Sequence, residues 1–254
     1  MADKIALVTG AGKRLGAAIA RGLADDGYEV VVHYNRSGKA AEETADSIRA
    51  KGGQARTAGF DLSDSDGVRG FLAGLGRIDV LINSASVFDY DSPESVTQDG
   101  LITALKVNLM APVLLTSEMA KAHSARASGC VINLLDQKLF NLNPDFFSYT
   151  LAKAGLQAAT HTMAMALAPA VRVNAVAPGI TLPSADQSEA EFEAAHRMNP
   201  MQGGATPDDI VRAVRFILAT PSMTGETVTI DGGQHLDPRP RDVMFDQRGG
   251  KDDT

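Results

Sequence analysis

Short apolar runs rich in β-branched residues alternate along the chain with longer segments whose apolar residues recur at helical spacing. Several of the short runs are apolar at successive positions, which is typical of strands buried on both faces. Such strands need helices on each side of their sheet. The pattern therefore predicts an α/β fold, in which a doubly wound sheet of seven parallel strands carries helices on both faces. The expected strands are residues 5–9, 29–34, 55–60, 79–83, 131–135, 171–177 and 227–230.

One domain is expected over residues 1–236, because no internal repeat and no linker divides this part of the chain. Residues 181–205 are expected to form an insertion with a short helix at 188–197. Its length and composition suit either a mobile lid over a substrate or an ordinary surface loop. The polar tail at 237–254 is expected to be disordered or to pair with another subunit. The longer helices are expected near residues 14–26, 38–51, 64–75, 97–125, 148–168 and 207–219.

The composition narrows the classes of partner. The chain has 254 residues, 44% of them hydrophobic, which suits a globular domain with a sizeable core. The net charge of −7 and the lack of interleaved basic and aromatic residues argue against nucleic acid or an acidic membrane as partner. The five histidines are scattered without metal-ligand spacing, so no metal is expected. The sequence has neither a signal peptide nor a run of 18 apolar residues, so a cytoplasmic location is expected.

A glycine-rich turn joins the first expected strand to the first expected helix. Gly10, Gly12 and Gly16 stand in the segment T-G-A-G-K-R-L-G, residues 9–16. Glycines at this spacing let the backbone approach a phosphate closely, and the helix that follows offers free N–H groups and a positive dipole end. A turn of this kind after the first strand of a doubly wound sheet indicates dinucleotide binding.

The end of the second strand indicates which dinucleotide is bound. An NAD-selective site usually ends this strand with an acid that binds the ribose 2′-hydroxyl. Here the strand continues into Tyr34-Asn35-Arg36-Ser37, and no acid follows before Glu42. Arg36 and Ser37 could bind a 2′-phosphate, and Arg14 could approach it from the glycine turn, so NADPH is the predicted cofactor. The alternative is that both arginines are only solvated.

A tyrosine and a lysine stand one helical turn apart, at Tyr149 and Lys153, and an acid, Asp136, precedes them by thirteen positions. A tyrosine with its ordinary pKa of about 10 is a poor acid or base at neutral pH. The spacing places both side chains on one helix face. An ammonium group within about 4–6 Å is expected to lower the pKa of the phenol. A lone Tyr-x-x-x-Lys is often a coincidence, so the pair gains meaning only from the other motifs.

In their order along the chain these motifs resemble the short-chain dehydrogenase/reductase family, over nearly the whole length. The other matching segments are Asp61-Leu62, Asn83-Ser84-Ala85-Ser86, Asn108, the stretch 172–179, Thr224-Gly225 and Asp231-Gly232-Gly233. The resemblance implies a Rossmann fold and hydride transfer from a nicotinamide. It implies that Tyr149 donates a proton, that Lys153 also binds the nicotinamide ribose, and that Asn108 holds a water in a relay to Lys153. The cofactor residues it implies are Gly10, Gly12, Arg14, Leu15, Gly16, Tyr34, Asn35, Arg36, Ser37, Asp61, Leu62, Asn83, Ala85, Ser86, Lys153, Pro178 and Gly179.

Most members of that family carry a serine where Asp136 stands, and its hydroxyl helps to hold a substrate carbonyl oxygen. An ionised carboxylate accepts hydrogen bonds but donates none, and it repels a developing oxyanion. Asp136 therefore suits a substrate that offers N–H donors or needs a proton at nitrogen, and burial is expected to raise its pKa. This arrangement resembles the pteridine reductases and dihydromonapterin reductases, as do Arg14 in the glycine turn and the segment 33–37.

The resemblance places Arg14, Ser86, Phe88, Asp136 and Tyr149 at the substrate. Phe88 would stack on a flat heterocycle and sandwich it against the nicotinamide; the alternative is a core aromatic in a loop. The predicted function is NADPH-dependent reduction of a small-molecule substrate with a pterin-like ring. The alternatives are a carbonyl reductase of a ketone or 3-oxoacyl substrate and a non-enzymatic dinucleotide sensor. The family also implies a homotetramer or homodimer built on the helices at 97–125 and 148–168.

Overall fold

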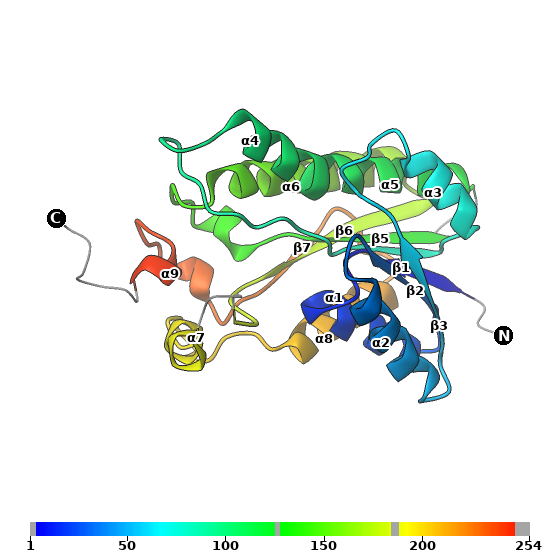
Figure 1. The fold of residues 1–254 in the computed structure, drawn as a ribbon, viewed down its shortest axis with the longest axis horizontal. Helices are drawn as coiled ribbons and strands as arrows, with labels where there is room; N and C mark the ends of the chain where they lie inside the picture. The colour runs from blue at the N-terminus through cyan, green and yellow to red at the C-terminus, as the bar shows by residue number, and fades with distance from the viewer. Residues whose placement is uncertain (1–3, 125–127, 184–187, 247–254) are drawn as a thin grey trace.

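The computed structural model describes residues 4–124, 128–183 and 188–246 of the chain. Within these residues, seven parallel strands form a sheet in the order β3-β2-β1-β4-β5-β6-β7, which confirms the predicted fold class (Figure 1). The strands are β1 (Ile5–Val8), β2 (Glu29–Tyr34), β3 (Gln54–Gly59), β4 (Val80–Asn83), β5 (Gly129–Leu134), β6 (Val171–Pro178) and β7 (Thr227–Ile230).

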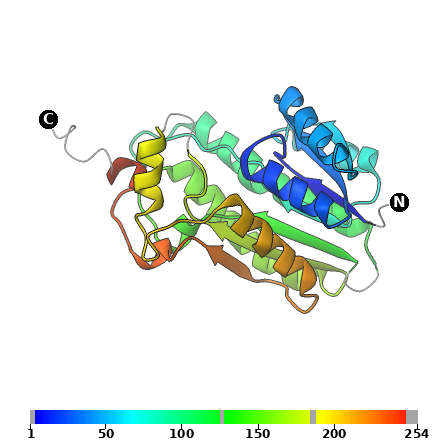
Figure 2. The same cartoon turned by 90° about the horizontal axis from the view of Figure 1, so that it is seen from below.

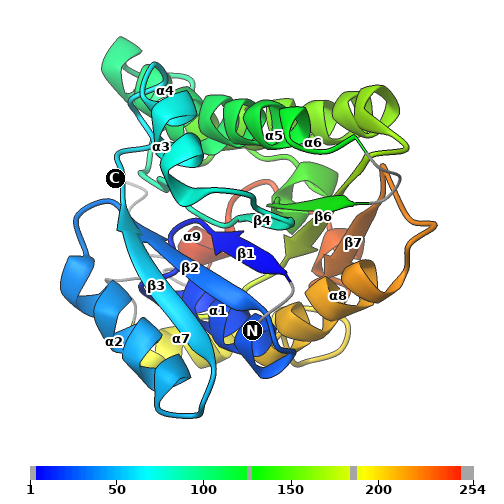
Figure 3. The same ribbon diagram turned by 90° about the vertical axis from the view of Figure 1, so that its right-hand side faces the viewer.

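Helices cover both faces of the sheet (Figure 3). One face carries α1 (Arg14–Asp25), α2 (Gly38–Arg49) and α8 (Pro207–Ala219), and the other carries α3 (Val68–Leu75), α4 (Gln98–Leu105), α5 (Ala111–Lys121) and α6 (Phe147–Leu167). The short helices α7 (Glu189–His196) and α9 (Val243–Asp246) lie beyond the carboxyl end of the sheet (Figure 2). Three single turns complete the set: η1 (Lys106–Met110), η2 (Gln137–Phe140) and η3 (Gln234–Leu236).

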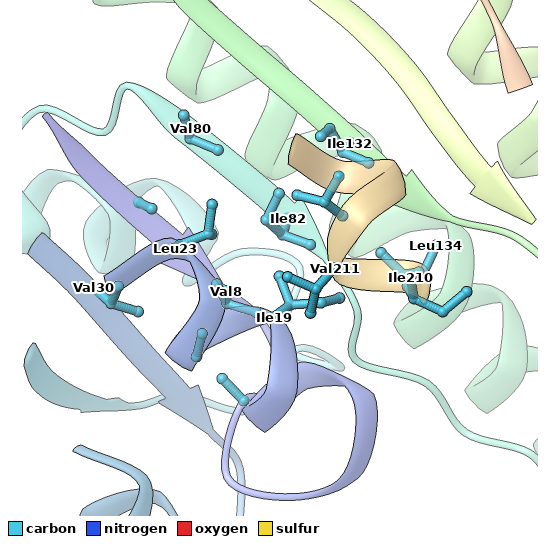
Figure 4. Close-up of a cluster of buried hydrophobic side chains, with 14 of the residues drawn as sticks. Val8, Ile19, Leu23, Val30, Val80, Ile82, Ile132, Leu134, Ile210 and Val211 are labelled. Carbon is cyan, nitrogen blue, oxygen red and sulfur yellow. The ribbon is translucent and has the colours of Figure 1, made fainter. Parts of the chain in front are cut away.

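Apolar side chains between the sheet and α1 and α8 form one core of the domain (Figure 4). Val8 of β1 and Ile82 of β4 lie in the same cluster as Ile19 of α1 and Ile210 of α8, and each of the four is at most 1% exposed. Full burial of a side chain of this size contributes about 1.5–3 kcal/mol. This packing holds α1 against the sheet, so the glycine turn at its start has a rigid support.

The helix expected at residues 97–125 is continuous in the structure but is not regular α-helix throughout. α4 ends at Leu105, η1 is a π-helical turn, and α5 continues from Ala111. Asn108 lies in this turn and is fully buried. Such π-turns inside helices are frequent at functional sites.

Among the described residues, one continuous helical run, Gln98–Lys121, is long and apolar enough to cross a membrane by length and composition. Its Leu115 and Met119 are at most 1% exposed and pack in the cluster that contains Leu7 and Leu81 of the sheet. The run is therefore a core helix of this domain.

The insertion after β6 contains the expected short helix, α7. Its start is a capping box, in which Ser188 Oγ accepts from the Glu191 N–H at 3.3 Å and the Glu191 carboxylate accepts from the Ser188 N–H at 2.8 Å. Residues 184–187 lie outside the described part of the chain, and a lid role for the insertion stays a prediction.

The folded domain extends past the expected boundary at residue 236. Residues 237–246 pack on it: Asn141 Nδ2 donates to the Asp237 carbonyl at 3.0 Å, and Lys138 pairs with Asp242 at 3.2 Å. These long-range contacts order the first half of a tail that composition alone marks as disordered or intersubunit. Residues 247–254 of that tail lie outside the described residues.

Candidate active site

The glycine turn and the loop after β4 meet where the strand order of the sheet reverses. β1 and β4 are neighbours although they are not consecutive, and the sheet continues from them in opposite directions, to β2 and to β5. Thr9 Oγ1 accepts hydrogen bonds from the backbone N–H groups of Ser84 and Ala85 at 2.9 and 3.0 Å, which joins the two loops. In open α/β sheets, ligands bind in the crevice at this switch point.

The turn between β1 and α1 allows a close approach of backbone groups. Gly10 has a φ of 66°, in the left-handed region, and a Cβ there would lie 2.8 Å from Ala85 Cα. A Cβ at Gly16 would lie 2.5 Å from the Gly10 carbonyl, and one at Gly12 would lie 3.2 Å from a backbone nitrogen of α2. Lys13 gives α1 no side-chain cap, so the N–H groups of the first turn are left for another acceptor. The turn therefore fits a pyrophosphate at a helix N-terminus.

A buried histidine holds the glycine turn against the second strand. The Gly10 N–H donates to His33 Nδ1 at 3.1 Å, and His33 Nε2 donates to the Phe60 carbonyl at 3.0 Å. The neutral ring satisfies both bonds, and burial lowers the pKa of His33 to about 4. The sequence assigns no role to His33; its one signal is a polar residue at the end of the apolar run 30–32.

Arg36 follows β2 and is exposed, and no hydrogen bond or ion pair to another described residue engages its guanidinium. The pKa of Asp61 is lowered first by a hydrogen bond from the Ser63 N–H at 2.9 Å and further by the nearby charge of Arg36. Asn35 is also exposed, and Ser37 precedes α2 without capping it. Arg36 and Ser37 are thus available to a phosphate at the start of α2.

Arg14 is the first residue of α1. Its guanidinium donates to the Pro183 carbonyl at 2.6 Å and to the Leu182 carbonyl at 3.4 Å, in the loop after β6. That Arg14 approaches a 2′-phosphate stays a prediction. Its position beside the insertion is consistent with the predicted place near the substrate.

Two predicted cofactor residues are core residues in the structure. Leu62 is 4% exposed and packs in an apolar cluster. Asn83 is 2% exposed, and its Nδ2 donates to Asn133 Oδ1 at 2.8 Å. Both support the crevice from below. The remaining predicted residues are near the carboxyl ends of the strands: Leu15 in the first turn of α1, Tyr34 at the end of β2, Ala85 and Ser86 after β4, and Pro178 and Gly179 at the end of β6.

β5 and α6 bring three polar side chains together. Tyr149 and Lys153 are one turn apart on α6, and Asp136 lies two residues beyond β5. Tyr149 Oη donates to Asp136 Oδ2 at 2.8 Å, and the Lys138 N–H donates to Asp136 Oδ1 at 2.8 Å. Lys153 Nζ donates to the Leu134 carbonyl at 2.6 Å. The predicted cluster is therefore assembled, with the phenol bonded directly to the acid.

Burial sets the protonation of this cluster. It raises the pKa of Tyr149 well above the ordinary value, and the negative charge of Asp136 raises it further. Burial also raises the pKa of Asp136 and lowers the pKa of Lys153 to about 8. The expectation that Lys153 lowers the pKa of the phenol is therefore wrong for this arrangement, because the phenol is bonded to an acid and the lysine to a backbone carbonyl. Tyr149 is consequently a protonated phenol at neutral pH.

Asn108 organises the loop after β4. Its side-chain NH₂ donates to the Val87 carbonyl at 2.8 Å, and its side-chain oxygen accepts from the Val87 N–H at 2.9 Å. Its side-chain amide thus holds the residue next to Phe88. The predicted water relay from Asn108 to Lys153 stays a prediction.

Phe88 is 43% exposed, so it is not a core aromatic. Its ring stacks on Phe146 at 4.0 Å between centroids and meets Tyr149 edge-on at 4.7 Å. Phe146 has a φ of 53°, in the left-handed region that non-glycine residues rarely adopt, and the sequence gives no sign of this. The two rings form an apolar wall beside the phenol. Among the described residues, no group of three or more His, Cys, Asp or Glu side chains is placed to hold a metal ion.

Residues 4–194 match the short chain dehydrogenase family. The chain belongs to this family. It is similar to FolM alternative dihydrofolate reductase 1 of Brucella canis, whose crystal structure contains NADP. The two are 40% identical with a TM-score of 0.87, over 94% of this chain and 96% of that one.

Ketone-reducing relatives are similar at lower identity. The angucycline C-6 ketoreductase LanV with bound NADP is 30% identical, with a TM-score of 0.84, over 92% of this chain and 96% of that one. The 3-oxoacyl-[acyl-carrier-protein] reductase of Synechocystis sp. is 33% identical over 248 residues, which are 91% of this chain and 96% of the relative. The predicted family is confirmed, and the relatives cover more than one substrate class.

Proposed function

We propose that the protein is an NADPH-dependent reductase of a pterin-like heterocycle, of the dihydropteridine or dihydrofolate type. The observation that carries the proposal is the 2.8 Å hydrogen bond from Tyr149 to Asp136, at a position where a serine is usual in the family. A carboxylate beside a ketone repels the developing oxyanion. Beside a ring nitrogen the carboxylate accepts a hydrogen bond from an N–H group, and the protonated acid delivers a proton.

The crevice suits the cofactor, which supplies the hydride when it is bound. Gly10, Gly12 and the uncapped start of α1 fit the pyrophosphate, and Arg36 with Ser37 fits a 2′-phosphate. The NADP in the crystal structures of the FolM and LanV relatives supports the same choice. Arg14, which contacts the loop after β6, belongs to the substrate side of the proposal.

Tyr149 and Asp136 act as the proton-donating pair. Reduction of a C=N bond consumes one hydride and one proton, and the proton goes to the ring nitrogen. Tyr149 holds its proton at neutral pH, as a phenol does at its ordinary pKa of about 10. Burial raises the pKa of Asp136, so this acid keeps its proton to higher pH than it would in water. Phe88, exposed beside the phenol, offers a flat apolar surface to the ring.

A carbonyl reductase of a ketone or 3-oxoacyl substrate is the second candidate. The likeness to the Synechocystis 3-oxoacyl reductase and to LanV favours it. Tyr149 and Lys153 serve either reaction, so Asp136 is the residue that separates the two candidates.

NADPH consumption with a panel of dihydropterins, dihydrofolate, ketones and a 3-oxoacyl thioester tests the proposal. We expect the wild-type protein to favour the pterin-type substrates. The matched variant Asp136→Ser restores the usual hydroxyl donor, so it should slow pterin reduction and raise ketone reduction. A wild-type preference for ketones would establish the second candidate. Binding of NADPH without turnover of any substrate would favour a dinucleotide sensor.

We also propose that the protein is a homodimer or homotetramer. α4 and α6 pack together and expose apolar side chains, with Ile102 41%, Leu151 43% and Met165 83% exposed. Exposed apolar residues gathered on two helices are typical of a subunit interface. Light scattering at micromolar concentration should give at least twice the 26.7 kDa of one chain, and a monomer mass would contradict the proposal.

A further inference from the structure

An ion pair between a buried lysine and a partly buried aspartate ties the turn after Asp136 to the C-terminal end of the domain. Lys138 Nζ lies 3.2 Å from Asp242 Oδ2 and also donates to Asn143 Oδ1. The Lys138 side chain is only 3% exposed. An ammonium group is costly to bury unless it is paired and hydrogen-bonded. The position of Lys138 therefore depends on Asp242 and Asn143.

The backbone of Lys138 in turn holds the acid of the active site. Its N–H donates to Asp136 Oδ1 at 2.8 Å, while Tyr149 donates to Oδ2 at 2.8 Å. Both oxygens of Asp136 are therefore oriented, one by the phenol and the other by η2. A displacement of η2 would turn the carboxyl group away from Tyr149.

A second ion pair holds Asp242 in place. The Asp242 N–H donates to Asp145 Oδ2 at 2.7 Å, and Arg241 Nε lies 2.9 Å from the same oxygen. Asp145 is 1% exposed and stands just before α6, the helix that carries Tyr149. Arg241 and Asp242 together thus connect η2 with the start of α6.

We propose that Asp242, through Lys138, is a positioning residue for Asp136, so that the C-terminal segment 237–246 forms part of the active site. This inference rests on the proposed role of Asp136 in proton delivery. Asp242 acts on geometry through η2 and on charge directly. After burial, its negative charge is among the causes that raise the pKa of Asp136 and of Tyr149.

Titratable and polar groups of three elements act on Asp136. The phenol of Tyr149 and the charge of Lys153 act from α6, the backbone N–H of Lys138 from η2, and the charge of Asp242 from the C-terminal segment. In Asp242→Asn the charge of Lys138 is unbalanced, so Asp136 should lose its proton at lower pH than in the wild type. In the double variant Lys138→Gln/Asp242→Asn both charges are gone. The pH at which Asp136 is half-protonated should then return towards the wild-type value.

The titration of Asp136 in the protein without substrate measures this directly. Carboxyl-¹³C aspartate is introduced, and the Asp136 resonance is assigned by its absence in Asp136→Asn. We expect a lower midpoint in Asp242→Asn and a near-wild-type midpoint in the double variant. The control Asp237→Asn removes a charge from the same segment, where it pairs with Arg239 at 2.7 Å, and should leave the midpoint unchanged.

Turnover gives the second readout. In Asp242→Asn, the fall of kcat at high pH should begin at lower pH. Its kcat should drop by roughly 3- to 30-fold, short of the ~10²–10⁴-fold cost of losing an acid, with the KM for NADPH unchanged. If Asp242→Asn does not fold, Lys138→Gln is measured instead. The titration midpoint of Asp136 must then lie at higher pH in Lys138→Gln than in the double variant.

The outcomes separate the two proposals. An unchanged Asp136 midpoint in folded Asp242→Asn, or equal midpoints in Lys138→Gln and the double variant, overturns the positioning role, whatever the substrate. A shifted midpoint in a protein that reduces no pterin supports the positioning role and overturns the proposed function.

Discussion

The phenol of Tyr149 donates a hydrogen bond to the carboxyl group of Asp136, with 2.8 Å between Oη and Oδ2. The bond joins the two groups that can supply a proton, and burial raises the pKa of both. Each group therefore keeps its proton to higher pH than it would in water. A protonated phenol hydrogen-bonded to an acid is an arrangement that suits a reaction in which the substrate is protonated.

Asp136→Asn keeps the volume of the side chain but removes its charge and its transferable proton. Reduction of a pterin-like ring should slow by about 10²–10⁴-fold in kcat/KM, the range of general acid–base contributions. Tyr149→Phe should abolish reduction of pterins and ketones alike, because both reactions require the phenol. NADPH affinity, measured by fluorescence titration, should stay near wild type in Asp136→Asn. Wild-type pterin turnover in this variant would show that the carboxyl group is incidental.

The rate of reduction should fall as the pH rises. Asp136 delivers a proton only while it is protonated, and its raised pKa extends that state above the ordinary carboxyl range. Lys153, with a pKa of about 8, also loses its positive charge as the pH rises. A profile of kcat/KM against pH should show both steps in the wild type and only the Lys153 step in Asp136→Asn. A wild-type rate that rises with pH would contradict proton delivery by Asp136.

The fold and the location of the site follow from local patterns in the sequence. Strands apolar on both faces predict the covered parallel sheet, and the glycine turn predicts the crevice, because each signal lies within a few consecutive residues. The spacing predicts a lowered pKa for Tyr149, whereas its pKa is raised, first by burial and then by the charge of Asp136, and neither cause lies within a few consecutive residues.

Long-range contacts cannot be predicted from the sequence for the same physical reason. The pairing of Lys138 with Asp242 spans 104 positions, and the bonds of Arg14 reach 169 positions along the chain. No periodicity or spacing encodes contacts of this kind. They arise from the arrangement of loops at the carboxyl end of the sheet, so only the assembled fold reveals them.

Arg36→Ala should weaken NADPH binding and leave NADH binding almost unchanged. A charge-assisted hydrogen bond to a phosphate contributes about 1.5–3 kcal/mol, so NADPH affinity should fall roughly tenfold or more. Arg21→Ala is the matched control: Arg21 is an exposed arginine on α1, and its Nε donates to Ser47 Oγ at 3.0 Å. The Arg21→Ala variant should bind NADPH and NADH as tightly as the wild type does. Equal losses for both dinucleotides in Arg36→Ala would show that Arg36 is not a ligand of the 2′-phosphate.

His33 should make the stability of the protein depend on pH below neutrality. Its pKa is about 4 in the folded protein, because the ring is buried, against 6.5 for an unperturbed histidine. Between these two values the unfolded chain binds a proton at this position and the folded protein does not. The contribution of neutral His33 is therefore complete above about pH 6.5 and is lost progressively as the pH falls towards about 4, up to roughly 3 kcal/mol.

His33→Gln isolates this effect, because glutamine can accept from Gly10 and donate to Phe60 but does not titrate in the range. At about pH 7.5 the variant should be less stable than the wild type by about 1–2 kcal/mol, from poorer hydrogen bonds in a buried site. At about pH 5 the difference should shrink or reverse, since only the wild type loses stability through position 33. Urea unfolding at the two pH values measures this difference in stability. His161→Gln, on the exposed face of α6, is the control. A difference between wild type and His33→Gln that stays constant with pH would mean that His33 titrates alike in the folded and unfolded states, and the glycine turn would then not rest on a neutral ring.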